Sequence, residues 1–172
     1  FSIFFIAYLH KKNVDPITAE IIRSGLNSAA EQMKKVLIRS AFSPIIYEVL
    51  DFASAIYDKN YCMLAQSPSL PGFMGTLSFC VEQSVKEVGG EENLFDGDII
   101  IYNNPFGSGS HSQDAAIVKP VFLKDELIGY TAIKAHWLDT GAKAPYCTDT
   151  VDIFQEGDYV TISGNSKGKG FQ

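Results

Sequence analysis

The stretch of sequence that decides the fold runs from residue 115 to residue 135 and reads AAIVKPVFLKDELIGYTAIKA. Its two apolar runs, residues 115–123 and 127–135, flank a polar turn at residues 124–126. Apolar runs rich in β-branched residues and joined by a short polar turn are typical of a β-hairpin. We therefore expect two antiparallel strands here, with the second strand returning beside the first.

Further strands are expected on the N-terminal side of this hairpin. Residues 99–102 predict a strand that is separated from the hairpin by an inserted polar loop, residues 103–114. Residues 52–57 and 61–65 predict a second hairpin around a turn at residues 58–60. Together with the hairpin at residues 115–135, the strand at residues 99–102 predicts a meander in the second half of the chain, with one loop inserted between its first two strands.

Two helices are expected in the first half of the chain. Apolar residues at spacings of three and four predict helices over residues 16–41 and 76–88. Asp15 before Pro16 marks the start of the first helix, because the aspartate caps it and proline suits its first turn. Gly89 and Gly90 end the second helix, and residues 66–75 between the hairpin and that helix are expected to form a loop.

These elements predict one α+β domain, with a two-layer, mainly antiparallel sheet covered by two longer helices. A chain of 172 residues without internal repeats is long enough for one core. We expect residues 1–13 to be a leader or edge strand, residues 14–160 to form the domain, and residues 161–172 to be a flexible, truncated tail. The apolar run Phe1–Leu9 has about half the length that a membrane span requires.

The charge and the cysteine usage limit the classes of partner. Fourteen basic against twenty acidic residues give a net charge of −6, which disfavours binding to nucleic acid or to an anionic membrane. The three cysteines are odd in number and widely spaced, which argues against a disulfide framework or a thiolate zinc site. We expect a cytoplasmic protein.

The inserted loop carries the strongest candidate for chemistry. His111 and Asp114 are three residues apart where the loop enters the strand at 115–123, so their side chains can reach one cation. Antiparallel pairing of the hairpin returns His136 to the neighbourhood of Asp114. Asp139 repeats the His-x-x-Asp spacing and is a candidate fourth ligand or a carboxylate that orients an imidazole. Imidazole and carboxylate ligands suit Mn, Fe or Zn, so we expect a divalent metal here.

Two other groups of residues are weaker candidates. Glu48 and Asp51 are a candidate catalytic carboxylate pair, with a solvated helix end as the alternative. Cys147 lies near Asp149 in the sequence and could form a thiolate dyad with His136, although an isolated cysteine usually has no such role.

An ordered set of motifs resembles the hydantoinase B/oxoprolinase family over residues 14–157. In chain order the motifs are Asp15-Pro16-Ile17-Thr18, Glu48-Val49-Leu50-Asp51-Phe52-Ala53, Gln66, Asn103-Asn104-Pro105, Gly109-Ser110-His111-x-x-Asp114, Leu127-Ile128-Gly129 and His136-x-x-Asp139. Members of this family are several times longer than this chain, so the resemblance implies the N-terminal part of a larger subunit. The chain departs from the usual family pattern at Phe73, Asn104, Phe106 and Gln113.

The resemblance implies that His111, Asp114 and His136 are metal ligands, in agreement with the spacing argument. It also implies that ATP is used through a partner, a hydantoinase A-type ATP-binding subunit, in a hetero-oligomer that acts on a small molecule. The leading hypothesis is a subunit of an ATP-dependent cyclic-amide hydrolase of the hydantoinase or 5-oxoprolinase type, with Asp139, Glu48 and Asp51 as catalytic candidates. The alternatives are a subunit of an acetone or acetophenone carboxylase and a non-catalytic scaffold domain that holds a partner subunit.

Overall fold

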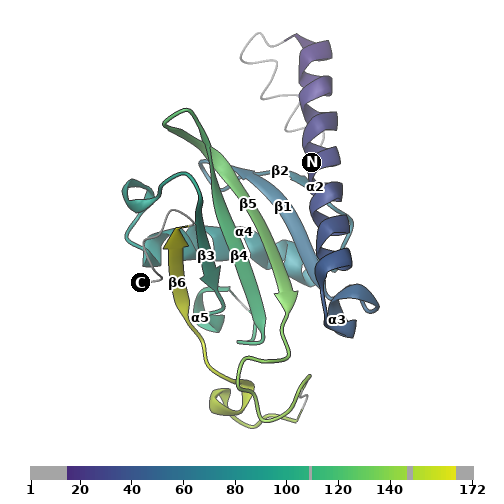
Figure 1. Ribbon diagram of the computed structural model, residues 1–172, viewed down its shortest axis with the longest axis vertical. Coiled ribbons are helices and arrows are strands. Elements are labelled where there is room, and N and C mark those ends of the chain that lie inside the picture. Colours follow the sequence, from purple (N-terminus) through teal and green to yellow (C-terminus); the bar gives the residue numbers. More distant parts are fainter. Residues whose placement is uncertain (1–14, 109, 147–148, 166–172) are drawn as a thin grey trace.

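A six-stranded antiparallel sheet forms the centre of the molecule (Figure 1). The computed structural model describes residues 15–108, 110–146 and 149–165. The strands lie side by side in the order β2-β1-β5-β4-β3-β6. Their bounds are β1 Phe52–Asp58, β2 Met63–Gln66, β3 Asp98–Tyr102, β4 Asp114–Leu123, β5 Glu126–His136 and β6 Thr161–Asn165. The expected α+β class and the mainly antiparallel sheet are confirmed.

The β4–β5 hairpin lies in the middle of the sheet, as the sequence predicted. Its register pairs Asp114, the first residue of β4, with His136, the last residue of β5. Phe52 at the start of β1 pairs with Ala135 on the other side of β5. These pairings bring together the start of β1, the end of β5 and the start of β4. The candidate site lies at this end of the strands.

The helix α4 (Pro71–Glu87) packs against one face of the sheet and forms most of the core with it. Leu77, Cys80 and Val81 of the helix contact a face that includes Tyr130 and Ala132 of β5, all fully buried or nearly so. The sequence prediction for the start of this helix was wrong, because residues 71–75 belong to the helix and not to a loop. Proline is favoured in the first turn of a helix, so Pro71 begins the helix instead of preventing it.

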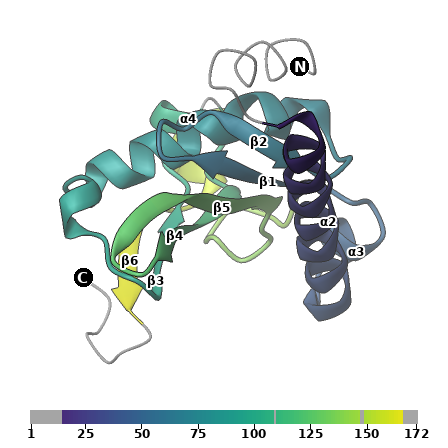
Figure 2. The ribbon, with the colours of Figure 1, turned by 90° about the horizontal axis from the view of Figure 1, so that it is seen from above.

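The helix α2 (Pro16–Ser40) lies on the other side of the sheet, over its β1–β2 end (Figure 2). Ala30 of this helix packs with Ile56 of β1 and Ala65 of β2. The Asp15 carboxylate accepts a hydrogen bond of 2.9 Å from the Thr18 backbone N–H, which confirms the predicted helix start. α2 therefore covers one end of the sheet only, on the face opposite to α4.

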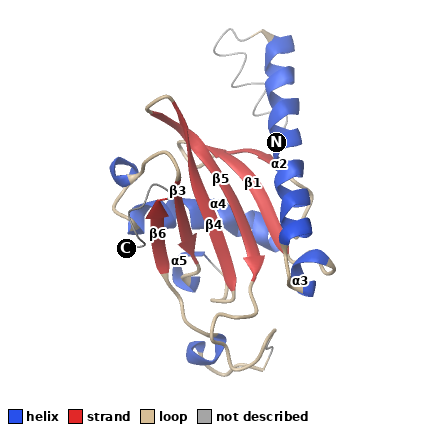
Figure 3. Cartoon of the chain, in the orientation of Figure 1, coloured by secondary structure: helices blue, strands red, loops and turns tan. Residues whose placement is uncertain are grey.

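Several short elements were not predicted. Residues 161–165, which we expected in a flexible tail, form β6 and pair with β3 at the sheet edge. The second hairpin strand begins at Met63 and not at Tyr61, because Tyr61 has a positive φ of 61° in the turn. Figure 3 shows the short helices that interrupt the loops, with bounds α3 Pro44–Tyr47, η1 Glu91–Asn93, α5 Pro105–Ser108 and η2 Ile153–Glu156.

Other expectations concern the ends of the chain and its cysteines. The proposed leader, residues 1–13, and Cys147 lie outside the described residues. Cys62 is an exposed free thiol, and Cys80 is buried in the core. Within the described part of the chain, none of the helices has both the length and the apolar character needed to span a membrane.

Two glycine substitutions are expected to change stability in opposite directions. A Cβ at Gly129 in β5 would lie 2.2 Å from the Tyr57 carbonyl oxygen of the paired strand, so Gly129→Ala should destabilise the fold by about 1–3 kcal/mol. Gly25 lies in the exposed interior of α2 with no atom within 4 Å of an added Cβ, so Gly25→Ala should stabilise by about 0.5–1 kcal/mol. Urea unfolding of both variants beside the wild type measures these changes. An undiminished stability of Gly129→Ala would contradict the close pairing of β1 with β5, and a destabilised Gly25→Ala would contradict the open surroundings of Gly25 in α2.

Candidate metal centre

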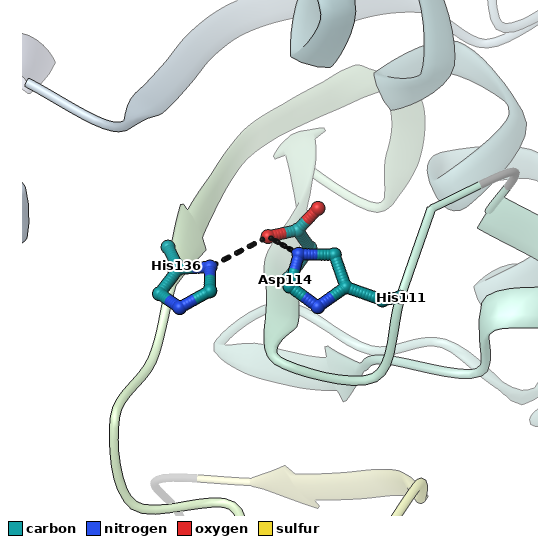
Figure 4. Close-up of side chains that lie close together, drawn as sticks. All are labelled: His111, Asp114 and His136. Carbon is teal, nitrogen blue, oxygen red and sulfur yellow. Dashed lines mark hydrogen bonds and ion pairs between the residues drawn. The ribbon is translucent and has the colours of Figure 1, made fainter. Parts of the chain in front are cut away.

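Three side chains meet at the edge of the sheet where the β4–β5 hairpin opens (Figure 4). Asp114 and His136 are opposite each other in the β4–β5 register. His111 is brought to the same point by a turn in which the Asp114 backbone N–H donates to the His111 carbonyl oxygen over 3.0 Å. A loop residue and the facing ends of two strands therefore supply the three groups.

The imidazole nitrogens of both histidines face one oxygen of the aspartate. His111 Nε2 and His136 Nδ1 each lie 3.2 Å from Asp114 Oδ1. The three candidate ligand atoms all lie within 4.8 Å of one another. Ligand atoms about 2.1 Å from a tetrahedral ion lie roughly 3.4 Å apart, so a small adjustment would accommodate one ion between them.

The carboxylate of Asp114 is held in its charged form. Burial acts to raise its pKa, but hydrogen bonds from His111 and His136 outweigh burial and lower the pKa to about 2. The pKa of His111 is raised, chiefly by its hydrogen bond to Asp114 and also by the charges of Asp114 and Glu156, against the opposing effect of burial. The carboxylate of Asp114 is therefore charged at neutral pH.

The burial of the site and its donor set fit a divalent metal. Asp114 and His136 are 2% and 3% exposed, whereas the His111 side chain is 37% exposed and gives access from one side. His136 Nε2 is buried and has no hydrogen-bond partner in the part of the chain described here. Two imidazoles and one carboxylate are the ligand types that Zn, Fe and Mn accept. The residues present therefore fit the metal class that the sequence predicted.

The loop that carries His111 is fixed by a segment much later in the chain. Asn103 Nδ2 donates to the carbonyl oxygens of Ser112, over 2.7 Å, and Asp158, over 2.9 Å. The Asn103 side-chain oxygen accepts from the Val160 backbone N–H over 2.6 Å, and the Ser112 hydroxyl donates to the Glu156 carbonyl oxygen over 3.0 Å. The segment before β6 is therefore bound to the inserted loop.

Glu156 is a site residue that sequence reasoning missed. Its Oε2 lies 3.5 Å from His111 Nδ1, the ring nitrogen that does not face Asp114. A carboxylate in this position fixes the tautomer and the orientation of a metal-binding imidazole. We expected Asp139 as a carboxylate that orients an imidazole, but Asp139 is exposed in the loop after β5. Glu156 is the carboxylate that lies beside the His111 imidazole.

The two residues of the predicted carboxylate pair differ in their burial. Asp51, 8% exposed, lies beside the centre, and its carbonyl oxygen accepts a 3.1 Å hydrogen bond from the His136 backbone N–H. Burial raises the pKa of Asp51, and the charges of Asp114, His111 and His136 act on it as well. Glu48 is exposed at the end of α3. The catalytic roles of Asp51, Glu48 and Asp139 stay predictions.

Lys134 is a second residue beside the centre that sequence reasoning missed. It is fully buried on β5, two residues before His136, and therefore on the same face of the strand. Asp149, which we considered beside Cys147, forms an ion pair of 2.8 Å with Lys143.

Comparison with known proteins places this chain in one family. The family model described as Hydantoinase B/oxoprolinase matches residues 15–163. The caprolactamase subunit beta of Pseudomonas jessenii is 33% identical over 146 residues, which are 84% of this chain and 25% of that protein. The chain spans between 10% and 26% of the length of the curated relatives it matches.

Solved structures share the fold. The crystal structure of the ATP-dependent caprolactamase from Pseudomonas jessenii matches 92% of this chain and 28% of its own, with a TM-score of 0.77 and 30% identity. The nucleotide-free structure of an acetone carboxylase matches 89% of this chain and 20% of its own, with a TM-score of 0.76 and 22% identity, a level that concerns the fold alone. The chain belongs to the hydantoinase B/oxoprolinase family.

Proposed function

We propose that this chain is part of a subunit of an ATP-dependent cyclic-amide hydrolase, and that His111, Asp114 and His136 hold a divalent metal that acts on the activated amide. The observation that carries the proposal is the convergence of these three ligands at one buried point, in a chain of this family. Caprolactam, hydantoin and 5-oxoproline, which give the relatives and the family their names, are all cyclic amides. A ring amide is therefore the favoured substrate class.

The need for ATP follows from the chemistry of the amide. An unactivated amide carbon is a poor electrophile, and phosphorylation of the amide oxygen would turn that oxygen into a leaving group. The chain shows no nucleotide-binding motif, so we assign the phosphorylation to a partner, a hydantoinase A-type ATP-binding subunit in a hetero-oligomer. This chain would receive the phosphorylated amide.

The residues around the centre can supply the remaining steps. A bound metal would polarise the reacting group or lower the pKa of water. Asp51 has a raised pKa beside the centre, which suits a group that accepts the proton of an attacking water. After water adds to the activated carbon, the ring C–N bond breaks, the nitrogen takes up a proton, and an acyl phosphate remains. A second water hydrolyses the acyl phosphate to the carboxylate and inorganic phosphate, so the phosphorylated oxygen leaves in this last step.

The carboxylase alternative has weaker support. The likeness to the acetone carboxylase concerns the fold, whereas the caprolactamase is similar in both sequence and fold. An assay with cyclic amides, and a second with a ketone and bicarbonate, separates the two reactions. ATP-dependent consumption of the ketone in the absence of any amide hydrolysis would favour the carboxylase.

The metal assignment predicts stoichiometric metal that depends on the ligands. The full-length subunit, desalted without chelator, should contain about one equivalent of Mn, Fe or Zn, and His111→Ala and Asp114→Ala should each lower the content at least roughly tenfold. Asp125→Asn, at the opposite end of the same hairpin, is the matched control and should retain the metal. Mass spectrometry measures the content. Absent metal, with ATP-dependent activity that survives His111→Ala, would support the scaffold alternative.

The two predicted carboxylates are expected to differ in their effect on turnover. Asp51→Asn should lower kcat of the assembled enzyme by about 10²–10⁴-fold, because it removes the proposed proton acceptor, while the metal content stays the same. Glu48→Gln, in the same segment but exposed, is the control and should change kcat little. Steady-state kinetics with a cyclic amide and ATP test this pair. Equal effects of the two substitutions would contradict the role of Asp51.

Glu156 is expected to affect metal retention without being a ligand. Glu156→Gln should weaken metal affinity by about 10–100-fold, because the His111 ring loses the carboxylate that orients it. Glu126→Gln, exposed at the far end of β5, is the control. Competition with a metal chelator measures the affinity, and an unchanged affinity of Glu156→Gln would show that the His111–Glu156 contact does not support the ligand.

A further inference from the structure

The buried lysine beside the metal centre is unusual in its surroundings. Lys134 lies on β5 between Ala53 of β1 and Ala116 of β4, and its side chain points toward α4. Its Nζ donates to Thr76 Oγ1 over 3.3 Å and to Ser110 Oγ, and it lies 5.5 Å from the centre of the Phe73 ring. Two hydroxyls and an aromatic face therefore surround a side chain that is 0% exposed.

These partners leave the charge of Lys134 without a direct counter-ion. Hydroxyls accept hydrogen bonds but carry no negative charge, and the ring face supplies only a weak attraction. The ion pairs among the described residues do not include Lys134. A buried ammonium is costly unless an anion compensates it. Lys134 has three N–H donors, and the described residues accept hydrogen bonds from two of them.

The ammonium lies close enough to influence the metal ligands. The charge of Lys134 acts to lower the pKa of both Asp114 and His111. Ser110, which Lys134 contacts, directly precedes His111 in the loop. A ligand that reaches Lys134 is therefore next to the metal centre, and a bound divalent ion would add positive charge on the same side. Both features favour an anion.

We propose that Lys134, positioned by Ser110 and Thr76, is an anion-binding residue that takes the phosphoryl group of the activated substrate beside the metal centre. This inference rests on the proposed function, which requires an O-phosphorylated amide. Lysine is a common point-charge partner of phosphate. A phosphoryl group with two negative charges is attracted to a buried ammonium more strongly than a carboxylate with one negative charge. The subsite would bind the phosphorylated amide in preference to the neutral amide, so hydrolysis would follow activation.

Titration of the metal-loaded, full-length subunit with inorganic phosphate tests the proposal without requiring turnover. With Mn²⁺ as the metal, ³¹P relaxation reports phosphate that binds near the ion. Lys134→Met should weaken phosphate binding at least about tenfold, Lys134→Arg should restore much of it, and Lys119→Met should leave it unchanged. Lys119 is the matched control because it is exposed on β4. The Mn²⁺ content should be the same in all four proteins.

Several outcomes would overturn the proposal. Phosphate affinity that does not depend on Lys134, or acetate that binds as tightly as phosphate, would exclude a phosphoryl subsite. If Lys134→Met does not fold, Ser110→Ala keeps the buried charge and should weaken phosphate binding about threefold. Unchanged binding in Ser110→Ala would then contradict the proposal. A wild type without metal or amide hydrolysis would refute the proposed function instead, so the two failures are distinguishable.

Discussion

The register of the β4–β5 hairpin is the constraint on which the candidate site depends. Asp114 and His136 share one face of the sheet because they are directly opposite each other. A slip of one residue would turn His136 and Lys134 to the other face, away from α4. Pairing of β5 with β1 adds Asp51 to the same edge, since Phe52 is opposite Ala135. One hydrogen-bonding pattern therefore positions groups from three strands.

Electrostatics explains why these groups tolerate burial together. Asp114 is nearly inaccessible, and two imidazoles stabilise its charge. Lys134 adds a positive charge from the same face, and Glu156 adds a negative charge on the far side of His111. Charged groups in an interior are stable only when each is compensated, and the proposed metal and anion would balance the charges of Asp114 and Lys134 respectively.

Local patterns in the sequence were sufficient for much of the fold. The two apolar runs and the polar turn at residues 124–126 predicted the central hairpin, and the spacing of apolar residues together with Asp15 predicted α2. The start of α4 was missed because Pro71, Gly72 and Gly75 resemble a loop when packing is not considered. β6 was missed because its short polar sequence has little strand character and is held by pairing with β3.

The sequence by itself determined the three metal-ligand candidates, since two of them are close in the chain and a hairpin brings the third to them. Only the tertiary structure decided which other groups join them. Glu156 reaches His111 because Asn103 and Ser112 hold its segment against the loop, and Asp51 reaches the centre through strand pairing. Lys134 is buried because α4 covers its face of β5. Such contacts between distant segments follow from the packing of the whole sheet, and no local spacing encodes them.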